Sequence, residues 1–180
     1  LVRCAAKVPP LGTFPDLSTS NVCRSILMKR MSWPEQLDDN FVTQLTEFVK
    51  RILGGYKDVP YHNREHAYHV VISTNKLIDL MVIRQNTWSK KKPPVTFGLR
   101  NDPTALLALL FASLIHDVEH QGIPNRQLAV EDDRLAILYN DQSIAENWSI
   151  YIGFSELLQD EFQHLRTVLF PEKEEYQRFR

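Results

Sequence analysis

Apolar residues recur every three to four positions through most of the chain after residue 35, which is the period of an α-helix. Asp38 and Asp39 open the first such segment, and Gly54-Gly55 closes it, because glycine commonly ends helices. The apolar positions of this segment are Phe41, Leu45, Phe48, Val49 and Ile52. Their spacing predicts an amphipathic helix that buries one face.

Helical spacing also predicts several elements further along the chain. One helix is predicted from Asn63 to about Ile83. Another begins at Asp102 and Pro103, because aspartate is a good N-cap and proline is favoured in the first turn. Apolar residues lie all round this helix, so we expect it to be central and buried. Shorter or later helices are predicted at residues 126–130, 133–138, 141–158 and up to about 169.

The absence of a strand-like alternation and of internal repeats indicates an all-α, compact multi-helix domain. Residues 1–35 are rich in proline, serine and threonine, which predicts a linker or N-terminal extension, so we place the domain at residues 36–180. The chain starts at Leu1 and ends at Arg180 within a charged run. We therefore expect it to be part of a longer polypeptide.

Composition narrows the class of partner. The formal net charge is −1, so no global charge favours nucleic acid or an anionic membrane, and an anionic substrate would need local positive charge. No stretch approaches the ~20 apolar residues of a membrane-spanning helix. The two cysteines, Cys4 and Cys23, are interpreted as free thiols in a reducing compartment. We expect an intracellular, cytoplasmic protein, although the full-length chain could be membrane-attached.

Four of the six histidines fall into two short clusters, His62 with His66 and His116 with His120. Each pair is four residues apart, which would place both rings on one helical face if the segment is helical. Asp117 follows His116 at the end of the apolar helix, where burying a carboxylate is costly unless it meets a cation. Imidazole and carboxylate suit zinc, manganese or iron, and a carboxylate can also bridge to magnesium. The pattern predicts a metal site.

An alternative is a zinc peptidase, because both clusters match the H-x-x-E-H pattern, as HNREH and HDVEH. In such enzymes the paired histidines bind zinc and the glutamate is the base. The pattern occurs twice, however, and one copy carries an aspartate directly after its first histidine. A peptidase needs one copy and has no use for the His-Asp pair, so this interpretation is disfavoured.

Three sequence blocks together resemble the catalytic domain of class I 3′,5′-cyclic-nucleotide phosphodiesterases. They are PYHNREHAYHV, ASLIHDVEHQGIPN and LAILYNDQSIAEN with a following GF. The resemblance covers roughly residues 35–180, the N-terminal part of such a domain, and the His-Asp pair is shared with the wider HD superfamily of metal-dependent phosphohydrolases. It implies hydrolysis of cyclic AMP, cyclic GMP or both to nucleoside 5′-monophosphates at a two-metal site, in cyclic-nucleotide signalling.

The resemblance also implies roles for the four central residues. His62 matches the family's proton donor to the leaving ribose 3′ oxygen. His66, His116 and Asp117 match ligands of a tightly held metal, normally zinc. Asp117 would also bridge to a second metal, normally magnesium, with manganese as a substitute.

Four further residues are matched around this centre. His120 and Glu146 match residues that hold the water molecules of the metals, and Asn125 matches a polar residue near the site. Tyr61 matches a residue of the substrate pocket, with simple packing as an equally open interpretation.

The match departs from the family in two places. Trp148-Ser149 stand where the family commonly has paired histidines. The fourth ligand of the tight metal, an aspartate, and the purine-binding glutamine would lie beyond residue 180. We therefore expect the 180-residue fragment to be inactive and the full-length protein, which could carry regulatory domains, to be active. The preference between cyclic AMP and cyclic GMP stays open.

A second hypothesis is a catalytically inactive metal-binding domain of the same fold with a regulatory or scaffolding role. The presence of His62 favours the enzyme, because a binding module would not need a proton donor.

Overall fold

The computed structural model describes residues 38–83 and 98–180, and every regular element within these ranges is helical. The all-α prediction is confirmed. The predicted linker and both cysteines lie outside the described residues. The described elements are α2 (Asp39–Gly54), α3 (Arg64–Ile78), the π-helical turn η2 (Asp79–Ile83), the 3-10 turn η4 (Leu99–Asn101), α4 (Pro103–Ile115), α5 (Asn125–Val130), α6 (Arg134–Tyr139), α7 (Ile144–Leu157), the 3-10 turn η5 (Asp160–Phe162), α8 (Gln163–Leu169) and α9 (Lys173–Phe179).

Side chains at the helix starts explain where the main helices begin. Asp38 accepts a hydrogen bond from the Phe41 N–H at 2.7 Å and caps α2. Asn63 caps α3 through the His66 N–H at 3.0 Å. Asp102 caps α4 in the same way, with Pro103 in its first turn, as the sequence predicts.

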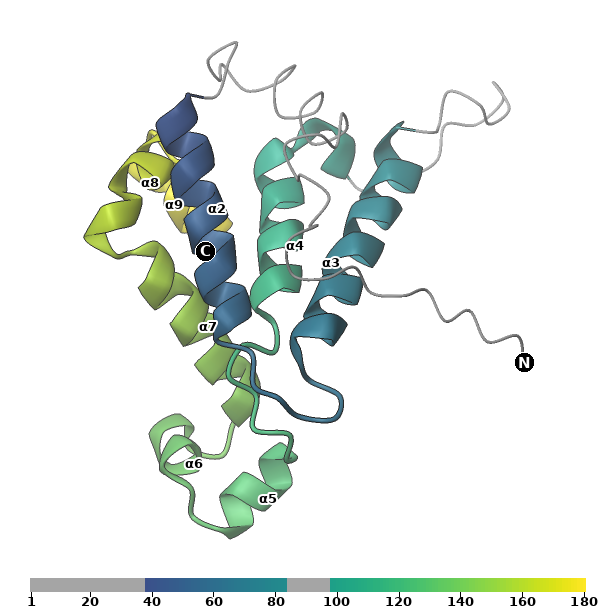
Figure 1. Ribbon diagram of the computed structural model, residues 1–180, viewed down its shortest axis with the longest axis vertical. Coiled ribbons are helices and arrows are strands. Elements are labelled where there is room, and N and C mark those ends of the chain that lie inside the picture. The colour runs from purple at the N-terminus through teal and green to yellow at the C-terminus, as the bar shows by residue number, and fades with distance from the viewer. Residues whose placement is uncertain (1–37, 84–97) are drawn as a thin grey trace.

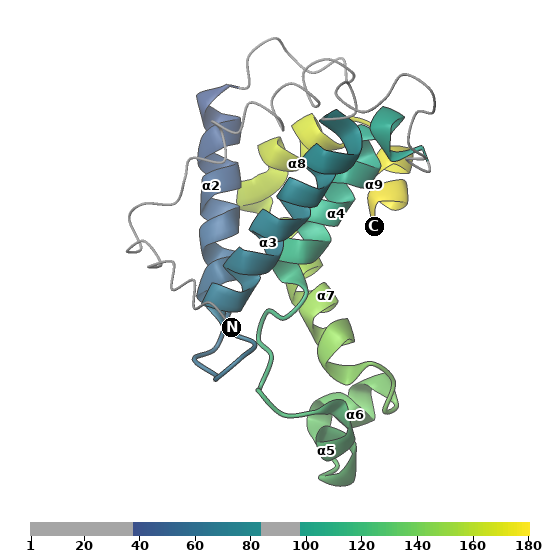
Figure 2. The same ribbon diagram turned by 90° about the vertical axis from the view of Figure 1, so that its right-hand side faces the viewer.

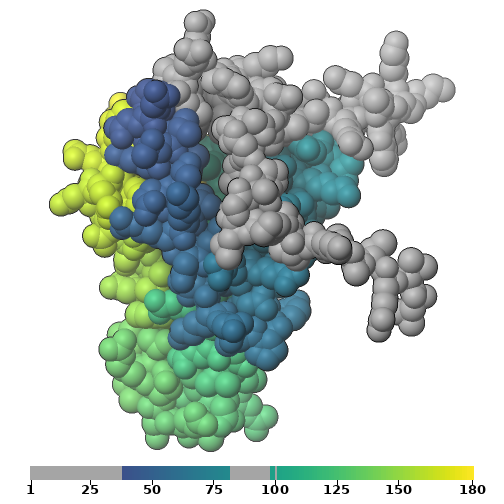
Figure 3. All heavy atoms as spheres, viewed as in Figure 1, coloured from purple at the N-terminus to yellow at the C-terminus, as the bar shows by residue number. Residues whose placement is uncertain are grey.

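The helix α4 lies between α3 on one side and α2, α7 and α9 on the other (Figure 1). The short helices α5 and α6 project beyond one end of the longer helices, which a quarter turn of the molecule makes clear (Figure 2). In the space-filling view, α2 packs against the α8–α9 segment along one side of the molecule, while α5 and α6 form the lower end (Figure 3). His116 and Asp117 directly follow α4, so the packing of α3 beside α4 places this pair next to the N-terminal end of α3.

Two larger apolar clusters and a small third one, formed by Ile78 and Leu106, hold the described helices together. The main core fills the space between α2, α4, α7 and α8, with Phe48, Ile52, Ile115 and Phe162 among its buried members. A smaller core lies under α5 and α6 and consists of Leu128, Leu135, Ala136 and Ile144. The N-terminal half of α7 therefore belongs to the smaller core and its C-terminal half to the main one.

The structure corrects three expectations. Within the described residues α4 is only partly buried, and the Leu109 side chain is 39% exposed. Helix α7 starts at Ile144 rather than at residue 141, because Asp141 and Ser143 have left-handed backbone angles (φ 61° and 43°) that a helix cannot contain. Helix α9 was not predicted, since its apolar signal is a single pair, Tyr176 and Phe179, in a charged segment.

None of the helices in the described ranges combines the length and the apolar content that crossing a membrane requires.

Candidate metal centre

Four of the predicted site residues meet where the start of α3 lies against the end of α4. His62 lies two residues before α3 and His66 in its first turn, while His116 and Asp117 directly follow α4. Asn63 fixes the turn between the two histidines, because its side chain accepts from the His66 N–H and donates to the Val59 carbonyl at 3.0 Å. The helix cap thus orients both histidines toward α4.

Three ligand-type atoms form a tight triangle. The Nε2 atoms of His66 and His116 are 3.3 Å apart, and Asp117 Oδ2 lies 3.5 Å from the first and 3.0 Å from the second. Zinc–ligand distances of about 2.0–2.1 Å in a tetrahedral site require ligand atoms roughly 3.3 Å apart. The residues present therefore fit a divalent metal without rearrangement.

Hydrogen bonds and burial shift the pKa values of these three groups. His116 Nδ1 must carry a hydrogen, because it donates to the Ser113 carbonyl at 3.0 Å. The hydrogen bond to Asp117 raises the pKa of His116, whereas burial lowers the pKa of His66. Burial opposes ionisation of Asp117, yet hydrogen bonds from His116 and His62 outweigh it and hold its pKa well below the usual value. An ionised Asp117 carboxylate and a His66 imidazole, whose lowered pKa favours the neutral form, thus converge on the point that a cation would occupy.

His62 contacts the same carboxylate from the other side. Its Nδ1 lies 2.7 Å from Asp117 Oδ2, and ligand atoms of His62, His66 and Asp117 all lie within 4.8 Å of one another. Distance alone therefore allows His62 as a ligand. An ionised Asp117 only accepts, so His62 Nδ1 carries the hydrogen, which leaves Nε2 as the atom that can exchange a proton.

Neither histidine pair shares a helical face. His62 precedes α3, and His116 and His120 lie in a turn after α4, so the helical explanation of the four-residue spacing is wrong. The two clusters meet because α3 packs beside α4.

His120 stacks on His62 with ring centroids 3.9 Å apart and accepts from the Gly122 N–H at 2.9 Å. Burial lowers the pKa of His120, which favours its neutral form.

Of the remaining predicted residues, Asn125 and Glu146 contact each other, and Tyr61 contacts His66. The Asn125 amide donates to Glu146 Oε2 at 2.8 Å, and its carbonyl accepts from the Ala145 N–H at 3.0 Å, so the two predicted residues form one unit joining α5 to α7. The Tyr61 side chain is 64% exposed, and its ring centroid lies 4.5 Å from that of His66. This exposure disfavours the interpretation of Tyr61 as a core-packing residue.

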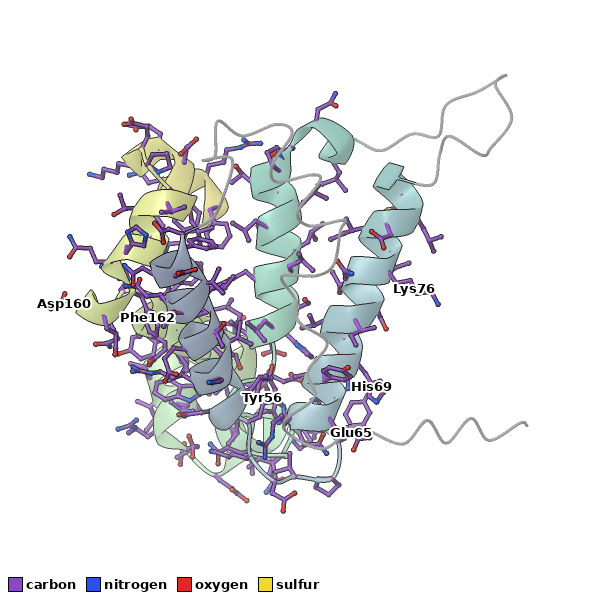
Figure 4. The ribbon with its side chains drawn as sticks, turned by 45° about the horizontal axis from the view of Figure 1, so that its top comes forward. Tyr56, Glu65, His69, Lys76, Asp160 and Phe162 are labelled. Atoms are coloured by element: carbon purple, nitrogen blue, oxygen red, sulfur yellow. The ribbon has the colours of Figure 1, made fainter. Side chains whose placement is uncertain are left out.

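Tyr56 is a site residue that the sequence did not indicate. Its hydroxyl donates to the Leu114 carbonyl at 2.9 Å and accepts from the Asp117 N–H at 3.3 Å, and burial raises its pKa. Figure 4 shows Tyr56 at the ends of α2 and α4, below their shared core. The hydroxyl thus fixes the backbone at the point where α4 ends and Asp117 begins. Its only sequence signal was a position just after the Gly54-Gly55 helix stop.

The second copy of the peptidase pattern, HDVEH, does not fit this geometry. His116–His120 is a turn rather than a helix, and Glu119 has a left-handed backbone with φ 61°. The Glu119 carboxylate accepts from the Trp148 indole N–H at 2.8 Å instead of facing the ligand triangle. It is therefore not placed as a base beside a metal.

The other two histidines lie apart from the centre. His69 is exposed on α3, 3.8 Å from Glu65 and on the side away from α4 (Figure 4). His164 pairs with Asp38 at 2.9 Å on another face.

Comparison with protein families gives a match over residues 61–180 to the model described as 3′5′-cyclic nucleotide phosphodiesterase. A mouse 3′,5′-cyclic-AMP phosphodiesterase 4C is 36% identical over 128 residues, which are 68% of this chain and 16% of the relative. A Drosophila melanogaster 3′,5′-cyclic-AMP phosphodiesterase, isoform F, is 38% identical over 105 residues, 58% of this chain and 14% of the relative. The chain thus spans a small part of these relatives.

Solved structures show the same fold. The phosphodiesterase domain of Salpingoeca rosetta rhodopsin phosphodiesterase has a TM-score of 0.61 at 24% identity, covering 88% of this chain and 42% of that one. A second structure of the phosphodiesterase domain of the same organism's fusion protein gives a TM-score of 0.63 at 24% identity, covering 92% and 48%. The described helices are therefore arranged as in a phosphodiesterase domain.

Proposed function

The chain belongs to the 3′,5′-cyclic nucleotide phosphodiesterase family, and from this premise we propose that its site hydrolyses 3′,5′-cyclic nucleotides to nucleoside 5′-monophosphates. Residues 36–180 would be the N-terminal part of the catalytic domain, preceded by a linker over 1–35. The mouse and fly relatives are named cyclic-AMP phosphodiesterases, so cyclic AMP is the first substrate to test, with cyclic GMP beside it.

The observation that carries this proposal is the triangle of His66 Nε2, His116 Nε2 and Asp117 Oδ2, with sides of 3.0 to 3.5 Å. These three residues would hold one divalent metal, zinc by the chemistry of its ligands, and Asp117 would also contact a second, magnesium or manganese. When bound, such metals offset the charge of the phosphodiester and activate water at neutral pH.

The chain's own residues supply orientation and the proton. Asp117 accepts from His62 Nδ1 and so directs the opposite ring nitrogen, Nε2, outward. As water oxygen bonds to phosphorus, the bond from phosphorus to the ribose 3′ oxygen breaks, and His62 Nε2 gives its proton to that oxygen. The attacking water loses one proton to the solvent, and His62 Nε2 takes one proton back from the solvent, so that one water molecule is consumed in each turnover. His120 stacks on His62 and limits the ring to one orientation.

Glu146, Asn125 and Tyr61 have supporting roles in this proposal. The hydrogen-bonded pair of Asn125 and Glu146 would hold water molecules of the metals, and the exposed Tyr61 ring would border the substrate. Regulatory domains elsewhere in the full-length protein would control access to the site.

The experiment is turnover of cyclic AMP and cyclic GMP by the full-length protein with zinc and magnesium, with the products separated chromatographically. We expect the 5′-monophosphate from at least one substrate and its loss after chelation. A metal-loaded, folded protein that hydrolyses neither nucleotide would contradict the proposal and favour the scaffolding alternative.

A further inference from the structure

The ligands His116 and Asp117 lie in a turn that no regular secondary structure holds in place. Helix α4 ends at Ile115, and α5 begins only at Asn125. Within the turn, Glu119 has φ 61°, a conformation that non-glycine residues adopt only when their surroundings impose it. Contacts from outside the turn must therefore fix the position of both ligands.

Two neighbouring side chains on α7 make such contacts. The Ser149 hydroxyl donates to the Val118 carbonyl at 2.8 Å, with Ser149 1% exposed and Val118 0% exposed. The Trp148 indole N–H donates to Glu119 Oε2 at 2.8 Å. Two consecutive residues of α7 thus form hydrogen bonds with Val118 and Glu119, the two residues that follow the ligand Asp117.

The helix α7 is itself well anchored at this point. The Trp148 ring stacks on Tyr151 with centroids 5.3 Å apart and packs against the smaller core under α5 and α6. One turn further along, Gly153 lies against Ile115, the last residue of α4. The hydrogen bonds from Trp148 and Ser149 therefore connect the turn to a well-packed helix instead of to another loop.

We propose that Trp148 and Ser149 are positioning residues, which hold the turn at 116–120 so that His116 and Asp117 face His66. This role rests on the proposed function for the identity of the reaction, but the geometry of the metal site alone defines it. Loss of either contact loosens the turn, which Tyr56 still holds at Asp117, so that the ligands share one point less often and the metal is held more weakly.

The test compares zinc affinity of full-length variants by competition with a chelating dye. We expect Trp148→Phe, Ser149→Ala and Glu119→Ala each to weaken zinc binding roughly 10-fold or more, within the 10–100-fold range of residues that support metal ligands. Glu119→Gln keeps an acceptor for the indole and should restore most of the affinity. Ser155→Ala and Tyr151→Phe, on the same helix, are matched controls that should bind zinc like the wild type.

A double-mutant cycle separates positioning from general destabilisation. Glu119→Ala combined with Trp148→Phe should weaken zinc binding no more than either change alone, because both remove the same hydrogen bond. Wild-type affinity in all three test variants, or equal weakening in the Ser155 and Tyr151 controls, overturns the proposal. If Ser149→Ala does not fold, the difference in zinc affinity between Glu119→Gln and Glu119→Ala tests the proposal. A wild type that binds zinc but leaves cyclic nucleotides intact refutes the proposed function and not this one.

Discussion

Single atoms around Asp117 determine what the site can do. Its Oδ2 lies 2.7 Å from His62 Nδ1 and 3.0 Å from His116 Nε2. One carboxylate oxygen therefore contacts both the hydrogen-bonded His62 and the candidate metal ligand His116. The residue types here could be read from the sequence, because a His-Asp pair at the end of an apolar helix is costly without a cation. The hydrogen-bond partner of each histidine ring nitrogen could not be read from the sequence, because it depends on how α3 and α4 pack together.

Tyr56→Phe tests the support of this carboxylate at the residue scale. The change leaves the partly buried Leu114 carbonyl and Asp117 N–H without the hydroxyl that joins them. We expect the free energy of unfolding to fall by about 1–3 kcal/mol, the usual cost of unpaired buried polar groups, together with weaker zinc binding. Denaturant unfolding and a zinc titration measure both. Unchanged stability and affinity would show that the hydroxyl is dispensable.

At the scale of elements, the site depends on how closely the helices approach each other. A Cβ atom on Gly153 would come within 2.8 Å of two Ile115 side-chain carbons, and Ile115 directly precedes the ligand His116. The partner of Gly153 lies 38 residues earlier in the chain and is set by the packing of α7 on α4, which has no local sequence signal.

Gly153→Ala is therefore expected to lower the free energy of unfolding by about 1–3 kcal/mol, because an extra methyl overpacks a closed contact. Gly54→Ala is the matched control, since nothing lies within 4 Å of a Cβ atom there. In the helix α2 it should stabilise the protein by up to about 1 kcal/mol. Urea unfolding of both variants decides. Equal effects at the two glycines would contradict the close approach of α7 to Ile115.

The N-cap of α2 predicts a pH effect on stability. The hydrogen bond from the Phe41 N–H, aided by His164, lowers the pKa of Asp38 below its ordinary 3.8. A carboxyl whose folded-state pKa is lowered stabilises the fold above its unfolded pKa, and this contribution disappears as the pH falls through the folded pKa.

Asp38→Asn keeps a good cap but cannot titrate. We expect the melting temperature of the wild type to fall further than that of the variant between about pH 5 and pH 2.5. Thermal melts at both pH values give the comparison. A difference between the two proteins that is independent of pH would contradict the role of the Asp38 charge.

At the scale of the whole molecule, a bound metal would join α3 to α4, because His66 belongs to the first and His116 and Asp117 follow the second. The sequence predicted the class of fold and most helix positions, since caps and apolar spacing are local signals. It overstated the burial of α4 and missed α9, because burial and short helices depend on neighbours far along the chain.

Zinc at about 100 times its dissociation constant should raise the free energy of unfolding by roughly 2.7 kcal/mol. Chelation should reverse the accompanying rise in melting temperature, and His116→Ala should abolish it. Calorimetry with and without zinc gives the answer. A melting temperature indifferent to zinc in the wild type would contradict a metal that bridges the two helices.

The most direct test of the division of roles between the histidines is His62→Ala in the full-length protein, with bound zinc and hydrolysis of cyclic AMP measured on the same sample. His62 lies close enough to count among the ligands by distance, but its proposed task is to give a proton to the leaving oxygen. We predict an unchanged zinc content and a kcat lowered about 10²- to 10⁴-fold. Loss of zinc together with activity would make His62 a ligand, and an unchanged kcat would remove it from the reaction.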